Sequence, residues 1–405
     1  MTKRKYFTYV LVLGLLTAIG PFSIDMYLPG FQDIAASLGT TAAMVALSLS
    51  SFFVGVSVGQ LLYGPLMDRY GRKKPLYVGL VLYIVATAVC METKDIHTLI
   101  ILRFIQAVGA CGAQVAAMAM VRDLFGAQDS AKVFSLLLLV LGASPMIAPT
   151  AGGYIVSVWS WRIVFMVLLI MAVLITVLTI VLLPESYPAD KQFSLKPLPI
   201  LRNFLSVLRV RQFIVYVLVE AFAFAGLLAY VAGSPLLFMG YFHLDKRTYG
   251  WVFAFLALAF IGLSQLNGVL LRRYKSEQIV WVALAGQAVV AVFFVVGMLL
   301  GWCGLGLTIF FLFAFLTCLG FVNPNASALS LAPFSKNAGT AASLLGFFQL
   351  GVGTLASVGV SVFSNGTPVS LVVVMAVTSV VAMAILMAGQ GSRATRLSGK
   401  DLSTR

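Results

Sequence analysis

The sequence predicts an all-α membrane protein of twelve transmembrane helices in two six-helix bundles. Its composition, the spacing of its apolar segments and an internal repeat support this prediction. Of its 405 residues, 61% are hydrophobic and only 10% are charged, whereas a soluble domain carries about 25% charged residues. The composition excludes a water-soluble globule. A dozen spans of about 20 residues each also leave no room for a separate soluble catalytic domain.

Apolar segments interrupted by charged residues, Gly or Pro give the candidate spans. The segment at 7–28 follows three basic residues, as a signal peptide does, but it is about 22 residues long and lacks a small-residue cleavage site. We therefore interpret it as the first helix. The twelve predicted spans lie near residues 7–28, 42–66, 75–92, 98–121, 131–156, 162–183, 212–237, 247–271, 278–299, 304–328, 338–364 and 368–389.

The basic residues predict the orientation of the chain. With both termini in the cytoplasm, most of the 27 Lys and Arg residues fall on the inner side, as the positive-inside rule requires. The net charge of +14 is spread in short clusters between spans, so it indicates topology rather than a nucleic-acid surface. The exceptions expected outside or within a span are Lys94, Arg103, Arg162, Lys246 and Arg247.

A polar, Pro-containing stretch divides the spans six and six. We expect an N-terminal bundle at 1–183, a cytoplasmic linker at 184–210, a C-terminal bundle at 211–389 and a cytoplasmic tail at 390–405. A short repeat supports this division, because Gly64–Tyr70 aligns without gaps with Gly268–Tyr274 at nearly half the chain length. Parallel six-helix repeats are typical of alternating-access transporters, and they disfavour a channel or a membrane enzyme.

Several segments carry a family resemblance. The segment Gly64–Lys74 resembles the loop 2-3 motif of the major facilitator superfamily, and it lies in the corresponding loop. Gly142–Gly153 is similar to the span-five motif of proton-driven exporters in that superfamily, with additional prolines. Further segments resemble the Bcr/CflA group of bacterial drug exporters: Ser23–Pro29, Val121–Phe125, Ser234-Pro235, Asn323–Ala326, Leu331–Phe334 and Gly339–Ala341.

The resemblance implies proton-coupled efflux across the bacterial cytoplasmic membrane. It also implies that Asp68, Arg72 and Asp123 form a cytoplasmic charge cluster that holds the two halves together in the outward-open state. Asp68 can also face the positive N-terminal end of span eleven. The alternative is that the basic residues of the loop serve only the orientation rule, which leaves Asp68 and Gly71 unexplained.

Three ionisable residues lie inside predicted spans and are candidate functional groups. Burying each costs about 2.5 to 3.5 kcal/mol on insertion scales, so Asp25, Arg103 and Glu220 each need a cavity, a partner or a proton. Asp25 and Arg103 have similar expected depths, and we expect them to pair or to share a water network. The alternatives for Asp25 are a structural ion pair and a proton-coupling carboxylate, and its polar helix face favours the second.

Glu220 departs from the Bcr/CflA pattern, in which an uncharged residue is usual. It lies about 12 Å into span seven, near the depth where transporters of this architecture bind substrate. We expect it to hold a second proton or a cationic group, or else to stay protonated or reach the inner aqueous vestibule. If Arg103 neutralises Asp25, Glu220 has no obvious partner in the sequence.

The remaining candidate residues fall into two groups. In span five, the glycines and prolines favour a close, kinked seam against the other bundle, although plain packing explains them equally well. The predicted substrate-binding residues are Asp25, Arg103, Gln114, Glu220, Phe224, Tyr230, Asn323 and Gln349. The predicted conformational residues are Asp68, Gly71, Arg72, Asp123, Gly142, Pro145, Pro149, Gly152 and Gly153.

We therefore expect a transporter that exports small amphipathic compounds, such as drugs or antibiotics, in exchange for protons. The alternatives are a proton-coupled exporter of one metabolite or siderophore, and a proton symporter. No nucleotide-binding loop, metal-ligand spacing or nucleophile motif occurs in the sequence, so we expect no enzyme activity, no cofactor and no metal. The expected partners are the substrate, protons and the lipid bilayer, with no nucleic acid, and we expect a monomer with four free cysteines.

Overall fold

The computed structural model describes residues 3–187, 189, 197–334, 338–363 and 367–401. Within these residues the secondary structure is entirely helical, without a β-strand. Twelve helical segments are long and apolar enough to cross a membrane. The predicted all-α, twelve-span fold class is therefore confirmed.

Several spanning helices extend beyond the predicted apolar segments, because backbone hydrogen bonding continues past the hydrocarbon edge. In contrast, the helix that begins at Lys246 ends at Ile261, before the predicted end at 271. Thr41, Asp95 and Ser160 each accept a backbone N–H at the start of a helix. The spanning helices are α1 (Lys3–Asp25), α3 (Ala42–Tyr70), α4 (Lys73–Glu92), α5 (Ile96–Leu124), α6 (Ala127–Val158), α7 (Trp161–Leu182), α9 (Arg211–Pro235), α10 (Lys246–Ile261), α12 (Ser276–Leu299), α13 (Leu305–Leu331), α14 (Ala338–Val362) and α15 (Val369–Asp401).

Short helical segments complete the chain, and the last two of them lie inside the predicted span at 247–271. They are η1 (Leu28–Gly30), α2 (Phe31–Ser37), α8 (Pro197–Leu208), η2 (Leu236–Tyr241), η3 (Leu263–Leu266) and α11 (Asn267–Leu270).

The predicted polar linker at 184–210 is thus partly helical, because Pro197 stands at the first position of α8, where proline is favoured. Residues 188 and 190–196 of this linker lie outside the described residues. The predicted tail at 390–405 is described only as the backbone of α15 up to Asp401.

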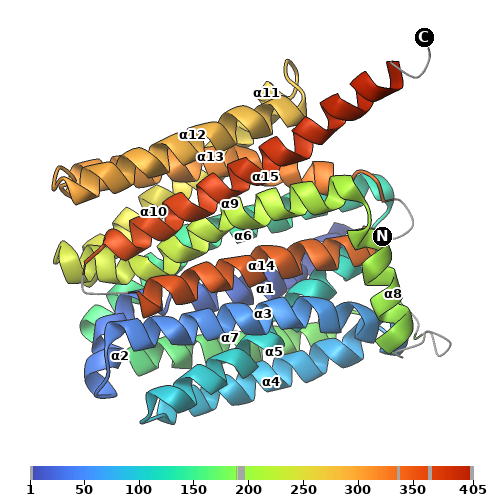
Figure 1. The fold of residues 1–405 in the computed structure, drawn as a ribbon. Coiled ribbons are helices and arrows are strands. Elements are labelled where there is room, and N and C mark those ends of the chain that lie inside the picture. The colour runs from blue at the N-terminus through green and yellow to red at the C-terminus, as the bar shows by residue number, and fades with distance from the viewer. Residues whose placement is uncertain (1–2, 188, 190–196, 335–337, 364–366, 402–405) are drawn as a thin grey trace.

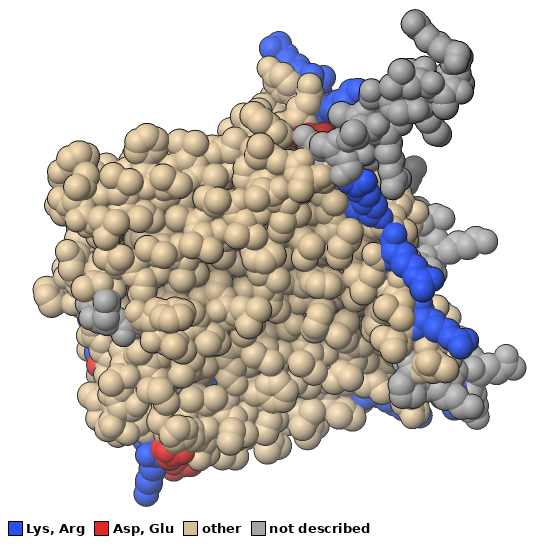
Figure 2. Space-filling view, viewed as in Figure 1, with Lys and Arg blue, Asp and Glu red and all other residues tan. Residues whose placement is uncertain are grey.

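The spanning helices lie side by side, and α8, α11 and both chain ends are at one end of the molecule (Figure 1). We call this end the linker side, and the opposite end, where α2 lies, the far side. Figure 2 shows that the middle of the visible surface is uncharged and that most of its Lys and Arg residues gather at the linker side. An uncharged belt between two charged ends suits a protein surrounded by lipid.

The helices pack in two sets that follow the order of the chain. In the first half, α5 packs against α3 and α4, and α1 packs against α5, α6 and α7. In the second half, α9 packs against α13, α14 and α15, and α12 packs against α13 and α15. The chain therefore folds as two adjacent bundles, whereas the predicted boundaries at residues 183 and 211 stay predictions.

Two long seams join the halves. In the α3–α14 seam, the hydroxyls of Ser50 and Ser357 lie 2.6 Å apart, and the Ser57 hydroxyl donates to the Phe347 carbonyl. In the α6–α10 seam, the Thr150 hydroxyl donates to the Gly250 carbonyl. Hydrogen bonds between backbone and small side chains suit closely packed helices in a membrane.

Polar contacts join the two halves on the far side. The Lys246 ammonium of α10 lies 2.6 Å from the Asp33 carboxylate of α2. The Arg247 guanidinium donates to the Ser157 hydroxyl of α6 at 3.1 Å. These contacts bridge the two halves at the end opposite to α8.

Gly153 provides a test of the α6–α10 seam. A Cβ at Gly153 would overlap the backbone carbonyl of Lys246, so Gly153→Ala should force the helices apart and lower the free energy of unfolding by about 1–3 kcal/mol. Thermal and denaturant unfolding of the purified protein in detergent would measure this. Gly20→Ala is the matched control, because a Cβ at Gly20 meets nothing within 4 Å. Equal stability of the two variants would contradict the close approach.

Candidate functional site

Asp25 ends α1 and faces the second half of the molecule. Its side chain is only 5% exposed, and it interacts electrostatically with the hydroxyls of Tyr230 in α9 and Tyr249 in α10. The Tyr249 hydroxyl lies 2.8 Å from that of Ser234. The Tyr230 ring stacks on Phe253, and its buried hydroxyl has no hydrogen-bond partner in the described structure. Asp25 and Tyr230, both predicted site residues, thus lie at one contact between the halves.

The neighbours of Asp25 hold the end of α1 within the first half. The Ser23 hydroxyl lies 2.6 Å from that of Tyr83, and the Tyr27 hydroxyl lies 2.7 Å from that of Ser48. Alternate residues of the Ser23–Pro29 segment therefore contact different halves. Asp25, between these two anchored residues, interacts electrostatically with Tyr230 of α9 and Tyr249 of α10.

Arg103 does not neutralise Asp25, so the predicted pairing is wrong for this conformation. Its guanidinium donates to the Gln106 side chain at 2.6 Å and to the Ser23 carbonyl at 2.9 Å, and none of the ion pairs among the described residues joins it to Asp25. The rings that contact its guanidinium belong to Tyr27, Phe52 and Phe165. Cation–π contacts and hydrogen bonds inside the first half thus replace the expected carboxylate, and Arg103 is fully buried there.

Glu220 lies in a polar cluster that joins three helices of the second half. Its Oε1 accepts a hydrogen bond from the Ser327 hydroxyl at 2.6 Å and from the Gln349 amide at 3.4 Å. The same Gln349 amide donates to the Asn323 side chain at 3.0 Å. Glu220 is 1% exposed, so it does not reach an aqueous vestibule in this conformation. Its hydrogen-bond partners are uncharged, and none of the ion pairs among the described residues involves it.

The predicted substrate-binding residues therefore occupy several places rather than one site. Phe224 is half-buried and makes an edge contact with Phe260, whereas Gln114 lines a pocket on the linker side. Asp25 and Tyr230 form one group, and Glu220, Asn323 and Gln349 form a second group. Arg103 contacts Ser23 and Tyr27, which flank Asp25 in the sequence, but it forms no ion pair with Asp25.

The predicted charge cluster lies on the linker side. The Arg72 guanidinium lies 2.8 Å from Asp68 and 2.9 Å from Asp123. Burial of Arg72 opposes its charge, but its hydrogen bonds with Asp123 and Asp68 outweigh this effect and raise the pKa of Arg72. The Tyr187 ring packs on the same guanidinium. These ion pairs stay within the first half and its linker, so they do not themselves join the two halves.

Gly71 and Glu185 shape the turn between α3 and α4. Gly71 has a φ of +84°, in the left-handed region that glycine adopts without strain. The Glu185 carboxylate accepts hydrogen bonds from the backbone N–H groups of Arg72 and Lys73. It thereby satisfies the free donors at the start of α4. The Ser186 hydroxyl donates to Asp123, so the start of the linker completes the charge cluster.

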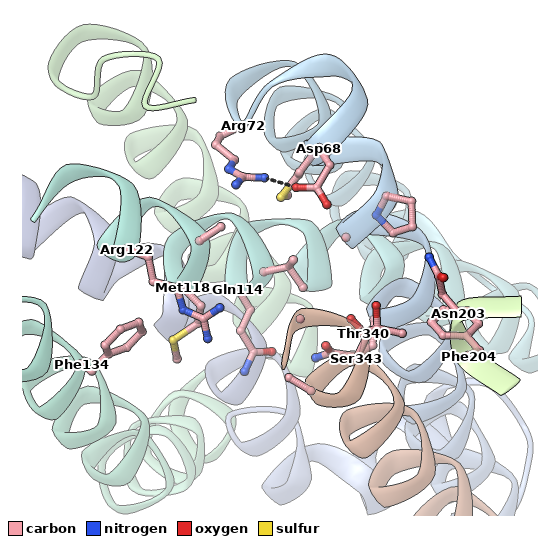
Figure 3. Close-up of a pocket in the computed structure, with 18 residues that line it drawn as sticks. Asp68, Arg72, Gln114, Met118, Arg122, Phe134, Asn203, Phe204, Thr340 and Ser343 are labelled. Carbon is pink, nitrogen blue, oxygen red and sulfur yellow. Dashed lines mark hydrogen bonds and ion pairs between the residues drawn. The ribbon is translucent and has the colours of Figure 1, made fainter. Parts of the chain in front are cut away.

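A pocket of about 520 Å³ opens beside this cluster. Figure 3 shows Gln114, Met118 and Arg122 of α5 facing Thr340 and Ser343 of α14, with Asn203 and Phe204 of α8 at one edge. Asp68 lines the pocket together with Gly339 and Thr340 in the first turn of α14. The pocket therefore combines residues of both halves and of α8, and it mixes polar with apolar walls.

The glycines and prolines of α6 do not all contact the same partner. A Cβ at Gly142 would meet the Ile261 side chain of α10, and one at Gly153 would meet the Lys246 carbonyl, so both positions lie at the seam with the second half. Gly152 instead approaches the Met26 carbonyl in the first half. Pro145 and Pro149 are inside α6, and Pro149 lies where Gly250 of α10 approaches.

Sequence reasoning missed Ser327, Tyr249 and Glu185. Ser327 lies four residues after Asn323, a spacing that puts both on one helix face, so this periodicity could have identified it. Glu185 stands directly after a span and close to a basic loop in the fold, but no sequence pattern links it to α4. Within the described residues, no three His, Cys, Asp or Glu side chains gather as a metal site would require.

Comparison with known proteins identifies related sequences over nearly the whole chain. The family model described as "Major Facilitator Superfamily" matches residues 13–357. The bicyclomycin resistance protein homolog of Haemophilus influenzae is 30% identical, over 87% of this chain and 88% of its own length. The multidrug resistance protein MdtL of a Shewanella strain is 31% identical, over 85% of this chain and 86% of its own length. Among solved structures, a D-xylose–proton symporter has a TM-score of 0.76 at 13% identity, over 94% and 97% of the two chains, and this likeness concerns the fold alone.

Glu185→Ala tests the role of the linker at the start of α4. Removing the carboxylate leaves the N–H groups of Arg72 and Lys73 without this acceptor, so stability should fall by about 1 kcal/mol, as for loss of a helix cap. Thermal unfolding in detergent would measure the change. Glu92→Ala, at the exposed end of the same helix, should leave stability nearly unchanged. A Glu185→Ala protein as stable as this control would contradict the capping role.

Proposed function

Because this chain belongs to the major facilitator superfamily, we propose that it exports small amphipathic compounds, including drugs and antibiotics, in exchange for protons. Relatives named for bicyclomycin resistance and multidrug resistance support the substrate class. The lipid-facing surface and the twelve spans suit a multi-pass bacterial membrane protein. We propose that it acts as a monomer in the inner membrane.

We propose that the linker side faces the cytoplasm. The basic cluster Arg69–Lys74 lies on this side, because Asp68 and Arg72 line one pocket with residues of α8. The cluster Arg272–Lys275 follows α11, which lies at the same end (Figure 1). Positive residues concentrate on the cytoplasmic side of membrane proteins. Both chain ends are then cytoplasmic, and the ion pair between Lys246 and Asp33 lies at the outer surface.

Transport would proceed by rocking of residues 1–183 against residues 211–389. The α3–α14 and α6–α10 seams are the surfaces along which the halves would move. With the halves joined on the far side and a pocket of about 520 Å³ on the linker side, the present conformation suits uptake of a compound from the cytoplasm. Opening toward the outside requires the contacts of Lys246 and Arg247 with the first half to break.

Asp25 is the observation that supports proton exchange most directly. It is a buried carboxyl at the contact between the halves, and the described structure gives it no cationic partner. An isolated charge is costly in such a place, so the carboxyl is stable when it carries a proton. Movement of α9 and α10 away from Asp25 would admit water and allow the proton to leave. The carboxyl would therefore bind and release one proton in each cycle.

Asp25→Asn should abolish export against a concentration gradient, because the amide cannot carry the proton. Proteoliposomes with an imposed pH gradient and a panel of labelled drugs would measure this export. Asp129→Asn is the control, since Asp129 is exposed and pairs only loosely with Lys132. Accumulation by Asp25→Asn at the wild-type level and with the wild-type pH dependence would show that Asp25 is structural.

We propose that Asp68, Arg72 and Asp123 bias the conformation of the halves without touching the exported compound. Asp68 is partly exposed, with 46% of its side-chain surface accessible, and lines the pocket with the first turn of α14, where a negative charge is favoured. Asp68→Asn should therefore slow transport several-fold and leave equilibrium binding within a few-fold of wild type. Paired transport and binding measurements would test this. Complete loss of binding by a folded variant would refute it.

A further inference from the structure

The Glu220 cluster is a second acidic site, separate from Asp25. It is built from α9, α13 and α14, whereas Asp25 belongs to the first half. Ser327 and Gln349 both donate to Oε1, while Oε2 is buried without a hydrogen-bond partner in the described structure. One carboxyl oxygen is thus held in place and the other is left for a further group.

None of the ion pairs among the described residues involves Glu220. The sequences of α13 (Leu305–Leu331), α14 (Ala338–Val362) and the spanning part of α15 (Val369–Gly389) contain no Asp, Glu, Lys, Arg or His. On α9 itself, Arg211 lies nine positions earlier, about 14 Å away along the axis, and donates to the Gly389 carbonyl.

The other elements packed on α9 carry their charges near the linker side. These are the exposed Arg202 and Arg209 of α8 and its adjoining turn, and Asp68 and Arg69 of α3, whereas η1 has none. The other titratable groups on these elements are Tyr63 and Tyr70 of α3, Tyr216 and Tyr230 of α9, Tyr241 of η2 and Cys318 of α13. Within the part of the chain that the structure describes, no side chain is placed to neutralise Glu220, which leaves a proton or a cationic ligand for that role.

The side chains that surround Glu220 are partly exposed, so the cluster can be reached from outside the protein. Ser327, Asn323 and Gln349 are all partly exposed, although Glu220 behind them is buried. Gln349 also lies three residues after Gly346 and thus on the same helix face, and Gly346 approaches the Gln60 side chain of α3. The cluster is therefore next to the α3–α14 seam, along which the halves would separate.

We propose that the Glu220 carboxyl binds the cationic group of an exported compound and a proton in turn. The inference rests on the proposed export function and specifies a substrate class, amphipathic cations. When the cation arrives, the O–H bond of the neutral carboxyl breaks and the proton leaves to water. The resulting carboxylate holds the cation by charge, and Ser327 and Gln349 continue to donate to Oε1. Reprotonation then displaces the cation.

A matched pair of probes tests this exchange. Tetraphenylphosphonium carries a positive charge, whereas triphenylphosphine oxide is neutral and chemically similar. Binding to the purified full chain in weakly buffered detergent would be followed by calorimetry and by a pH-sensitive dye. Wild-type protein should release about one proton for each cation that binds, and its affinity for the cation should rise with pH. Binding of the neutral probe should release no proton.

Glu220→Gln should remove this behaviour selectively. The amide preserves the shape of the neutral acid, and its oxygen still accepts the hydrogen bond from the Ser327 hydroxyl. The variant should therefore fold, and a melting curve would verify this. Affinity for the cation should fall about 30-fold or more, the low end for loss of one partner of a buried charge pair. Proton release should vanish, and binding of the neutral probe should change little. Glu220→Asp should restore part of the proton release.

Other outcomes would overturn the cation site in distinguishable ways. Equal loss of both probes in folded Glu220→Gln would make Glu220 structural. Unchanged cation binding and proton release would also refute the proposal. Binding of only the neutral probe by wild type would refute the cation site while leaving export possible. In contrast, failure of wild type to export any drug of the panel would refute the proposed function itself.

Discussion

The absence of water around the backbone is the constraint on which this structure depends. Each buried N–H and carbonyl must find a partner inside the protein, which accounts for a chain that is helical throughout its described spans. Helices satisfy the backbone internally, so the specificity of packing comes from side chains. Small residues at the seams allow backbones to approach, as Gly153 does against the Lys246 carbonyl. Polar side chains that enter the membrane must then be paired inside the protein, and these few groups define the chemistry available to it.

The architecture was predictable because it depends on properties that a sequence displays directly. Long apolar segments, basic loops and a repeat near half length predict twelve spans in two sets. The partners of buried polar groups were less predictable, because they depend on helix rotation. Arg103 illustrates this limit. Its depth in the membrane predicted Asp25 as its ion-pair partner, whereas its guanidinium contacts aromatic rings and the Ser23 carbonyl. In contrast, Glu220 was predicted from its charge and depth, and Asn323 and Gln349 from their polarity within spans, and the fold brings all three together.

The two halves place their buried charges differently. The first half contains Arg103 and Asp25, but it surrounds the cation with aromatic rings and turns the carboxyl toward the other half. The second half has one buried acid, Glu220, and fixes it with uncharged hydrogen-bond donors. The linker-side turn shows the same asymmetry: the ion pairs of Arg72 with Asp68 and Asp123 have no equivalent in the second copy, where Arg272 and Lys275 replace Asp68 and Gly71. A shared fold therefore supports unequal electrostatic roles.

The placement of α8 affects how the polypeptide could be divided. Val207 of this helix is buried with Phe213, Ala341 and Leu344 of the second half, while Asn203 and Phe204 form part of the pocket wall. The connection is thus a structural component of the C-terminal unit and not a simple tether. The gene could be divided to produce two separately translated fragments. A division before Pro197 would keep α8, with its part of the pocket wall, in the same fragment as the C-terminal bundle. A cut after Leu208 would assign α8 to the fragment whose core it does not join, and complementation between the fragments would then depend on that helix docking in trans.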